Sequence, residues 1–121
     1  MEIQLLFMMF SEMSLLAYLQ NQVQRISFSN VLASYIQQLV ENGEAAIGPP
    51  GAPIEHLAGQ KNLCAMRFKL GISNLRVFFV YKDGLIYLLS SFYERQGHKN
   101  TEYSTHTPIA KTRFAELMEG E

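Results

Sequence analysis

The amino-acid sequence predicts an α+β domain in which helices pack on one antiparallel β-sheet. An amphipathic helical pattern occupies residues 28–41. Three runs rich in aromatic and β-branched residues follow, at 63–70, 75–82 and 85–93. The dipeptide Asp83-Gly84 separates the last two runs, which is a strong signal for a β-hairpin. With 121 residues, 48% of them hydrophobic, the chain can bury a core and is expected to form one domain, residues 1–121.

The N-terminal third is expected to form a helical hairpin, residues 12–41. Segment 2–10 is short and apolar, and its pattern fits either a first strand or the lead-in to a helix. Apolar residues within 13–19 fit a short first helix, and the second helix repeats apolar residues at the i, i+3, i+4, i+7 spacing of one buried face. Asn42-Gly43 predicts where the second helix ends.

The rest of the chain is expected to contain a long loop, a β-meander and a C-terminal helix. Residues 43–60 hold three of the four prolines, which favours a loop. The meander covers residues 63–93. A polar stretch, 94–106, precedes a final helix over 107–118, in which Pro108 occupies the first helical position.

Composition excludes several classes of site. A single cysteine, Cys64, excludes an internal disulfide and a multi-cysteine zinc site, and three scattered histidines form no ligand cluster. No apolar run reaches the roughly 20 residues that a membrane helix needs, and the acidic start Met1-Glu2 does not resemble a secretory signal. We therefore expect a cytoplasmic protein with no metal, no cofactor and no membrane association. Cys64 is interpreted as a small buried apolar residue.

The charges are unevenly distributed along the chain, although the net charge is only −1. Residues 61–113 hold nine of the ten Lys and Arg residues and three acidic residues, which gives this region a net charge of +6. The segments on either side of it are acidic. Such asymmetry is typical of a face that binds a polyanion. The alternative is that the strands carry Lys and Arg on ordinary solvated faces.

The basic residues of this region fall on strands and strand ends. Arg67 and Lys69 are two residues apart on one strand, so their side chains lie on one face. Arg76 lies inside an otherwise apolar run, where a guanidinium is costly unless it meets an anion. Tyr93 ends the third strand. Other basic or proton-carrying residues flank the strands: Lys61, Arg95, His98 and Lys99. Together these residues predict a phosphate-binding face.

Arg76 separates the two interpretations of this region. On a phosphate-binding face the position is polar, so we expect Arg76→Ala to leave the fold intact. In the alternative interpretation each cation pairs with a carboxylate of the helices, such as Glu41 or Glu116 for Arg76. Elsewhere the sequence contains no Gly-rich phosphate loop, no Ser–His–Asp or Cys–His pattern, and no carboxylate pair suited to acid–base catalysis.

Six short motifs occur in order between residues 12 and 118: Leu39-Val-Glu-Asn-Gly43, His56-Leu-Ala-Gly59, Leu63-Cys-Ala-Met-Arg67, Leu75-Arg-Val-Phe-Phe79, Phe92-Tyr-Glu-Arg95 and Ile109-Ala-Lys-Thr-Arg113. Taken together they resemble the RelE/HigB superfamily of bacterial toxins, most closely its phage-derived, HigB-like branch. The chain departs from the pattern of that branch at Cys64-Ala65, where the branch has Trp-Glu, and at Glu94, where it has a lysine.

The resemblance implies a RelE-like fold and the function of the toxin in a type II toxin–antitoxin pair. Such toxins cleave mRNA in the ribosomal A site without a metal, by attack of a ribose 2′-OH on the adjacent phosphate. The resemblance assigns Arg76 to the negative charge that develops on that phosphate, and Arg67 and Arg95 to flanking phosphates. It implies proton transfer by Tyr93 or His98. It implies RNA binding by three lysines: Lys61, Lys69 and Lys99. The implied partners are mRNA and a HigA-like helix-turn-helix antitoxin.

Two other functions fit the same resemblance. A ParE-like relative would bind gyrase and cleave no RNA. A degenerate, non-catalytic member of the family would act only through its partner and would cause no growth arrest. A helix-turn-helix protein encoded in the neighbouring reading frame would support a toxin–antitoxin pair.

Overall fold

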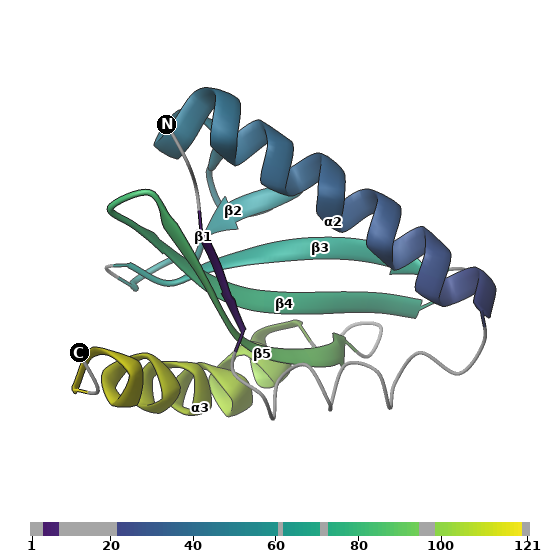
Figure 1. Ribbon diagram of the computed structural model, residues 1–121. Coiled ribbons are helices and arrows are strands. Elements are labelled where there is room, and N and C mark those ends of the chain that lie inside the picture. The colour runs from purple at the N-terminus through teal and green to yellow at the C-terminus, as the bar shows by residue number, and fades with distance from the viewer. Residues whose placement is uncertain (1–3, 8–21, 61, 71–72, 95–98, 120–121) are drawn as a thin grey trace.

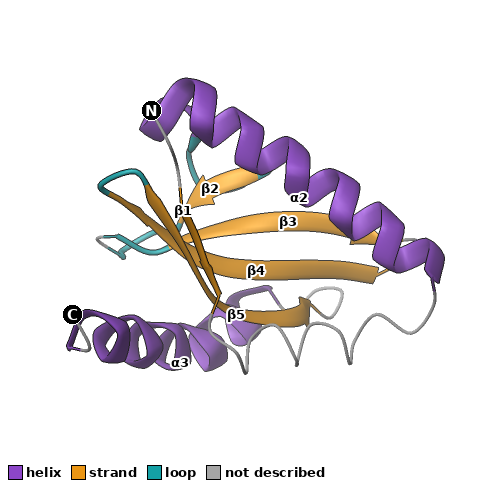
Figure 2. Cartoon of the chain, viewed as in Figure 1, coloured by secondary structure: helices purple, strands orange, loops and turns teal. Residues whose placement is uncertain are grey.

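The chain folds into a five-stranded β-sheet with one long helix on each face (Figure 1). The computed structural model describes residues 4–7, 22–60, 62–70, 73–94 and 99–119. The elements in chain order are β1 (Gln4–Phe7), α2 (Gln22–Asn42), the 3₁₀ helix η1 (Gly43–Ala46), β2 (Ile54–His56), β3 (Cys64–Leu70), β4 (Ser73–Lys82), β5 (Leu85–Glu94) and α3 (Lys99–Glu119). The strand order is β1-β5-β4-β3-β2, with β2 to β5 antiparallel and β1 parallel to β5 (Figure 2). The predicted α+β class is confirmed.

The β4–β5 hairpin has the pairing and the turn that the sequence predicts. The two strands are antiparallel neighbours, and Asp83 and Gly84 form the two-residue connection between them. Both residues have a positive φ, 53° and 75°, as a type I′ turn requires. A register shift opposite Phe78 and Phe79 leaves Leu89 as an extra residue on β5.

Alternating side chains of the sheet build two apolar cores, one under each helix. Under α2, the ring of Phe68 contacts those of Phe28 and Tyr35, at centroid distances of 4.6 and 5.4 Å. Under α3, the rings of Phe78 and Phe92 lie 5.0 Å apart and belong to the second core. Because successive residues of a strand point to opposite faces, the buried apolar residues along β4 alternate between the two cores.

Helix α3 begins well before the predicted start at residue 107, so this prediction is wrong at its N-terminal end. Pro108 lies inside the helix and not at its first position. Ring contacts hold the additional turns, with Tyr103 against Phe78 at 5.2 Å and His106 stacked on Phe92 at 4.1 Å. Tertiary packing thus stabilises a polar stretch whose local propensity does not indicate a helix.

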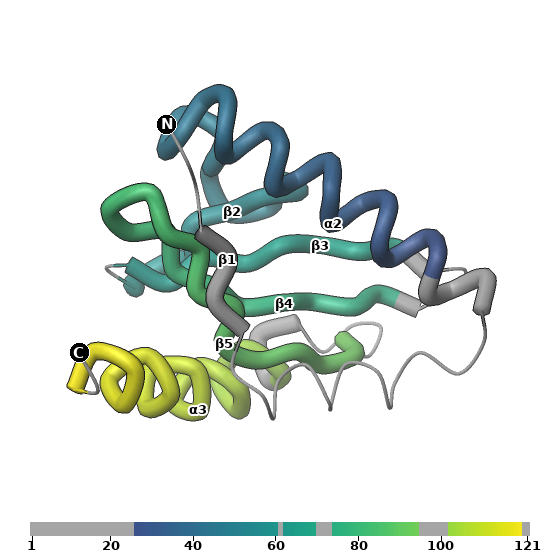
Figure 3. The backbone as a smooth tube through the Cα atoms, viewed as in Figure 1, coloured from purple at the N-terminus to yellow at the C-terminus, as the bar shows by residue number. Residues whose placement is uncertain are grey.

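Strand β2 lies within residues 43–60, which the sequence predicts to be a loop. Its three residues pair with β3, and Gly48 also bonds to it: the Gly48 N–H donates to the Ile54 oxygen at 2.8 Å, and the His56 N–H donates to the Gly48 oxygen at 3.0 Å. Figure 3 shows the chain passing from α2 to this outer strand. A three-residue strand that follows a proline has no alternating pattern, so the sequence carries no signal for it.

The N-terminal half agrees with part of the predicted helical hairpin. Helix α2 ends at Asn42, and Gly43 has a φ of 58°, as expected from the Asn-Gly pair. Helix α2 begins at Gln22 and not at 28, because an apolar stripe marks the packed part of a helix and not its full length. The predicted first helix, 13–19, lies outside the described residues. For residues 4–7 the structure selects a strand over the lead-in to a helix.

Candidate functional site

A buried polar network links three strands to helix α3. Arg76 of β4 is 3% exposed and forms an ion pair with Glu94 of β5. Its Nε donates a hydrogen bond to the Tyr103 hydroxyl at 3.1 Å. That hydroxyl in turn donates to Oε2 of Glu55, on β2, at 3.3 Å. The other oxygen of Glu55 accepts from the N–H of Gly51, also at 3.3 Å. Two carboxylates, one guanidinium and one phenol therefore meet on the α3 face of the sheet.

Strand register explains why these side chains share one face. Glu55 lies directly opposite Ala65 on β3, so its side chain points to the face of the core under α3. Arg76 is two residues before Phe78 on β4, and Glu94 is two residues after Phe92 on β5, which places both on that same face. Helix α3 supplies Tyr103 from the opposite side of the network.

Burial determines the protonation of the Tyr103 hydroxyl. Burial, followed by the negative charge of Glu55, raises its pKa to about 12, while the charge of Arg76 acts in the opposite direction. Tyr103 is therefore a phenol and not a phenolate at neutral pH. The Tyr103 hydroxyl donates its single proton to the Glu55 carboxylate and can instead donate it to an oxygen of a bound ligand.

Arg67 and Arg76 form a like-charged pair across two strands. The two residues lie directly opposite one another on β3 and β4. The Nη1 group of Arg76 and the Nε group of Arg67 are both buried and have no hydrogen-bond partner within the described part of the chain. Because a buried N–H of a guanidinium is costly to leave unpaired, the pair has unused capacity for an anion.

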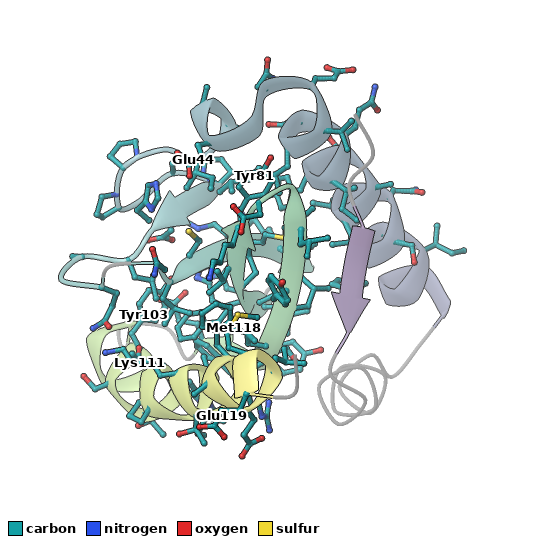
Figure 4. All side chains as sticks on the ribbon, turned by 60° about the vertical axis from the view of Figure 1, so that its left-hand side comes forward. Glu44, Tyr81, Tyr103, Lys111, Met118 and Glu119 are labelled. Carbon is teal, nitrogen blue, oxygen red and sulfur yellow. The ribbon has the colours of Figure 1, made fainter. Side chains whose placement is uncertain are left out.

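A pocket of about 660 Å³ opens beside the network. Its lining includes Glu55, Tyr103, Gln60 from the β2–β3 connection and Lys111 from α3. Figure 4 shows Tyr103 and Lys111 on the same side of the molecule. A second pocket of about 410 Å³ shares Gln60 and Lys111 with the first, so the two are neighbours between that connection and α3. Both volumes are typical of small-molecule sites, and one side of the first pocket is the buried carboxylate Glu55.

The structure brings together some of the predicted site residues and separates others. Arg67 and Arg76 are neighbours, and the exposed Lys69 follows Arg67 on β3. Tyr93 packs against the core under α2, so it lies on the opposite face of the sheet from Arg76. Lys99 is the first residue of α3, and its side chain is not described. Three residues lie outside the described part of the chain: Lys61, Arg95 and His98.

The partners of Arg76 differ from both sequence-based interpretations. The side chain is buried and not on a solvated polar face, and it pairs with the strand residue Glu94 and not with Glu41 or Glu116. The sequence also provides no reason to expect Glu55 and Glu94 at this site, where Glu55 is bonded to Tyr103 and Glu94 to Arg76. Both acids were overlooked because sequence separation hides contacts across a sheet.

Tyr103 is the site residue that sequence reasoning could have found. Tyr103, Ala110, Phe114 and Leu117 are spaced by seven, four and three residues, which is the period of one helical face. All four contribute to the core under α3. Because the predicted helix begins at residue 107, with Pro108 at its first helical position, Tyr103 was left out of this stripe.

The interpretation of Cys64 as a buried residue is confirmed, because it is 2% exposed. Burial, followed by the charges of Glu44 and Glu55, raises the pKa of its thiol to about 12. The thiol is therefore protonated at neutral pH and is not a nucleophile. Its sulfur lies 3.6 Å from Nδ1 of His56.

Among the described residues, no group of three or more His, Cys, Asp or Glu side chains is arranged to hold a metal ion. None of the helices in that part of the chain has the length and apolar character needed to cross a membrane. No protein-family model matches the chain, and neither a curated protein nor a solved structure is significantly similar to it.

Proposed function

We propose that this protein is a toxin of the RelE/HigB type, a metal-independent endoribonuclease that cleaves mRNA in the ribosomal A site and is neutralised by a HigA-like antitoxin. The observation that carries the proposal is the Arg67–Arg76 pair, in which two buried guanidinium nitrogens have no hydrogen-bond partner among the described residues. A phosphate is the ligand that such a pair recognises best. The ordered sequence motifs supply the second support.

Glu55 is the general base in this proposal. Where the resembled toxins have a Trp-Glu pair, this chain has Cys64-Ala65, and Glu55 lies opposite Ala65 on the neighbouring strand. A carboxylate therefore lies on the same face, one strand further out. It takes the proton of the ribose 2′-OH as the 2′-oxygen attacks the phosphorus.

The remaining groups act on the phosphate and on the leaving oxygen. Arg76 and Arg67 stabilise the extra negative charge that develops as the 2′-oxygen bonds to phosphorus. The bond from phosphorus to the 5′-oxygen then breaks, and that oxygen takes the proton of Tyr103. The hydrogen bond between Tyr103 and Glu55 returns the proton from the carboxyl to the phenolate, which restores both groups. Tyr103 thus takes the role that the resemblance gave to Tyr93.

Growth arrest and mRNA cleavage in cells test the roles assigned to Arg67 and Arg76. Arg67→Ala and Arg76→Lys are induced separately, and the 5′ ends of cellular mRNA are mapped, with melting curves as the folding control. We expect each variant to lower cleavage by about 10²–10³-fold, which is typical of a lost donor at a developing oxyanion. Lys82→Ala, at the exposed end of β4, is the matched control and is expected to cleave like the parent. Folded Arg67→Ala and Arg76→Lys proteins that cleave at the parent rate contradict the proposal.

One observation favours a second candidate, the non-catalytic family member. Arg76 is already neutralised by Glu94, as a purely structural arginine would be. This candidate predicts neither growth arrest nor new mRNA ends from the parent protein. A ParE-like toxin predicts growth arrest without new mRNA ends, so the same experiment separates all three functions.

A further inference from the structure

The proposed chemistry requires access to Arg76 that the described conformation does not provide. Arg76 is 3% exposed, and the Tyr103 hydroxyl occupies its Nε. A phosphate cannot form the bonds proposed above while Tyr103 stays in this position. The cover comes from the first half of helix α3, so the state of that half controls access to the site.

The two halves of α3 are held to the sheet in different ways. Before Pro108, none of the residues 102–107 is fully buried. Their attachments to the sheet include the hydrogen bonds and ring contacts of Tyr103 and the stack of His106 on Phe92. After Pro108, Ala110 is fully buried, and Arg113 donates to the Leu89 oxygen at 2.8 Å. That oxygen belongs to the extra residue of β5. The second half is therefore anchored by a fully buried side chain and a hydrogen bond to the backbone of β5, whereas the first half is attached through side chains that are only partly buried.

Pro108 weakens the connection between the two halves. Proline has no N–H, so the Ser104 oxygen lacks the donor that the regular helix would provide four residues later. Proline is also the commonest cause of helix bending. The helix is thus least continuous at the point where its attachment changes.

We propose that residues 102–107 form a lid that moves about Pro108, opening to admit an RNA phosphate to Arg76 and closing over it. The closed lid, as described, is an autoinhibited state. Reclosure over a bound phosphate brings the Tyr103 hydroxyl beside the leaving oxygen, with the phosphate in place of Tyr103 at Nε of Arg76. This inference rests on the proposed function, because a lid over Arg76 is needed only where Arg76 meets a substrate.

Arginine modification measures lid opening without RNA. The purified protein is treated with phenylglyoxal, and the rate of modification at Arg76 is followed by mass spectrometry. His106→Ala removes the ring stack on Phe92 without touching Arg76, and we expect the rate to rise about two- to tenfold. Pro108→Ala restores the helical donor, and we expect the rate to fall about tenfold. Ser104→Ala, on the exposed face of the lid, is the matched control with an unchanged rate.

Hydrogen exchange of the unmodified parent protein provides the second measurement. Amides of residues 102–107 are expected to exchange at least about tenfold faster than those of 110–119. Equal rates of Arg76 modification in all four proteins, or uniform exchange along α3, overturn the lid. Neither readout involves RNA, so failure of the lid is measured separately from failure of the proposed cleavage. If the modification rates change as expected but the protein cleaves no RNA, the proposed function fails and the lid stands.

Discussion

Arg76 combines a structural and a proposed chemical role in one side chain. Its guanidinium compensates the buried carboxylate of Glu94 and orients Tyr103. Strand alternation is a local property, so the sequence predicts that Arg67 and Lys69 share one face of their strand. The register that sets Arg67 opposite Arg76 comes from the structure. The sequence cannot predict that Arg76 is buried against Glu94, because that depends on how β4, β5 and α3 meet.

Arg76→Ala is expected to destabilise the fold, contrary to the expectation from the sequence. Removing one partner of a buried ion pair leaves the other uncompensated, which lowers the free energy of unfolding by about 3–5 kcal/mol. Urea denaturation measures this. Replacing both partners, as Arg76→Met with Glu94→Leu, is expected to recover most of the loss. A single variant as stable as the parent would mean that the pair is not buried in solution.

His106 is expected to make the stability of the fold depend on pH. Burial lowers the pKa of His106 below 6.5; Glu102, 3.7 Å away, opposes this shift, and Arg113 adds to it. Below the unfolded-state pKa the unfolded chain binds a proton that the folded chain does not. The free energy of unfolding is therefore expected to fall as the pH decreases through and below about 6.5.

The comparison of the parent with His106→Asn isolates this residue from the other two histidines. Urea denaturation across the acid range is expected to give a shallower pH dependence for the variant than for the parent. Identical slopes would show that His106 titrates in the folded protein as it does in the unfolded chain.

At the scale of elements, local chemistry explains what the sequence predicts well and where it fails. The β4–β5 hairpin is predicted correctly because Asp83 and Gly84 carry a turn signal of their own. Strand β2 and the first half of α3 are missed because each is held by contacts that are distant in sequence, namely pairing with β3 and the rings of Phe78 and Phe92. These two missed elements supply Glu55 and Tyr103, which is why these two residues of the site were not predicted.

The hairpin turn offers a test at this scale. Gly84 has a φ of 75°, so Gly84→Ala places a Cβ in the left-handed region. We expect the free energy of unfolding to fall by about 1–2 kcal/mol. Asp83→Asn is the matched control, since asparagine tolerates the left-handed region at least as well as aspartate, and no change is expected. Equal stability of Gly84→Ala and the parent would argue against a type I′ turn.

At the scale of the whole molecule, the two faces of the sheet differ in polarity. The face under α2 is an apolar core, to which even Tyr93 contributes. The face under α3 holds the polar network and the pocket with Lys111, together with the two guanidinium nitrogens, Nε of Arg67 and Nη1 of Arg76, that have no hydrogen-bond partner in the described part of the chain. The basic residues at this face come from the net-positive region 61–113, on β3, β4 and α3. The acidic residue Glu55 comes from the N-terminal half of the chain. The uneven charge distribution predicted a polyanion face, but not the carboxylate that the proposed reaction needs.

Analysis of RNA ends produced by the purified protein tests the central proposal most directly. Programmed ribosomes are incubated with the parent, Glu55→Gln and Lys82→Ala proteins. The account predicts cleavage by the parent and by Lys82→Ala, with a 2′,3′-cyclic phosphate on one fragment and a 5′-OH on the other. It predicts a rate for folded Glu55→Gln that is lower by about 10²–10⁴-fold, as expected for loss of a general base. Absence of cleavage by the parent, or equal rates for Glu55→Gln and Lys82→Ala, would contradict it.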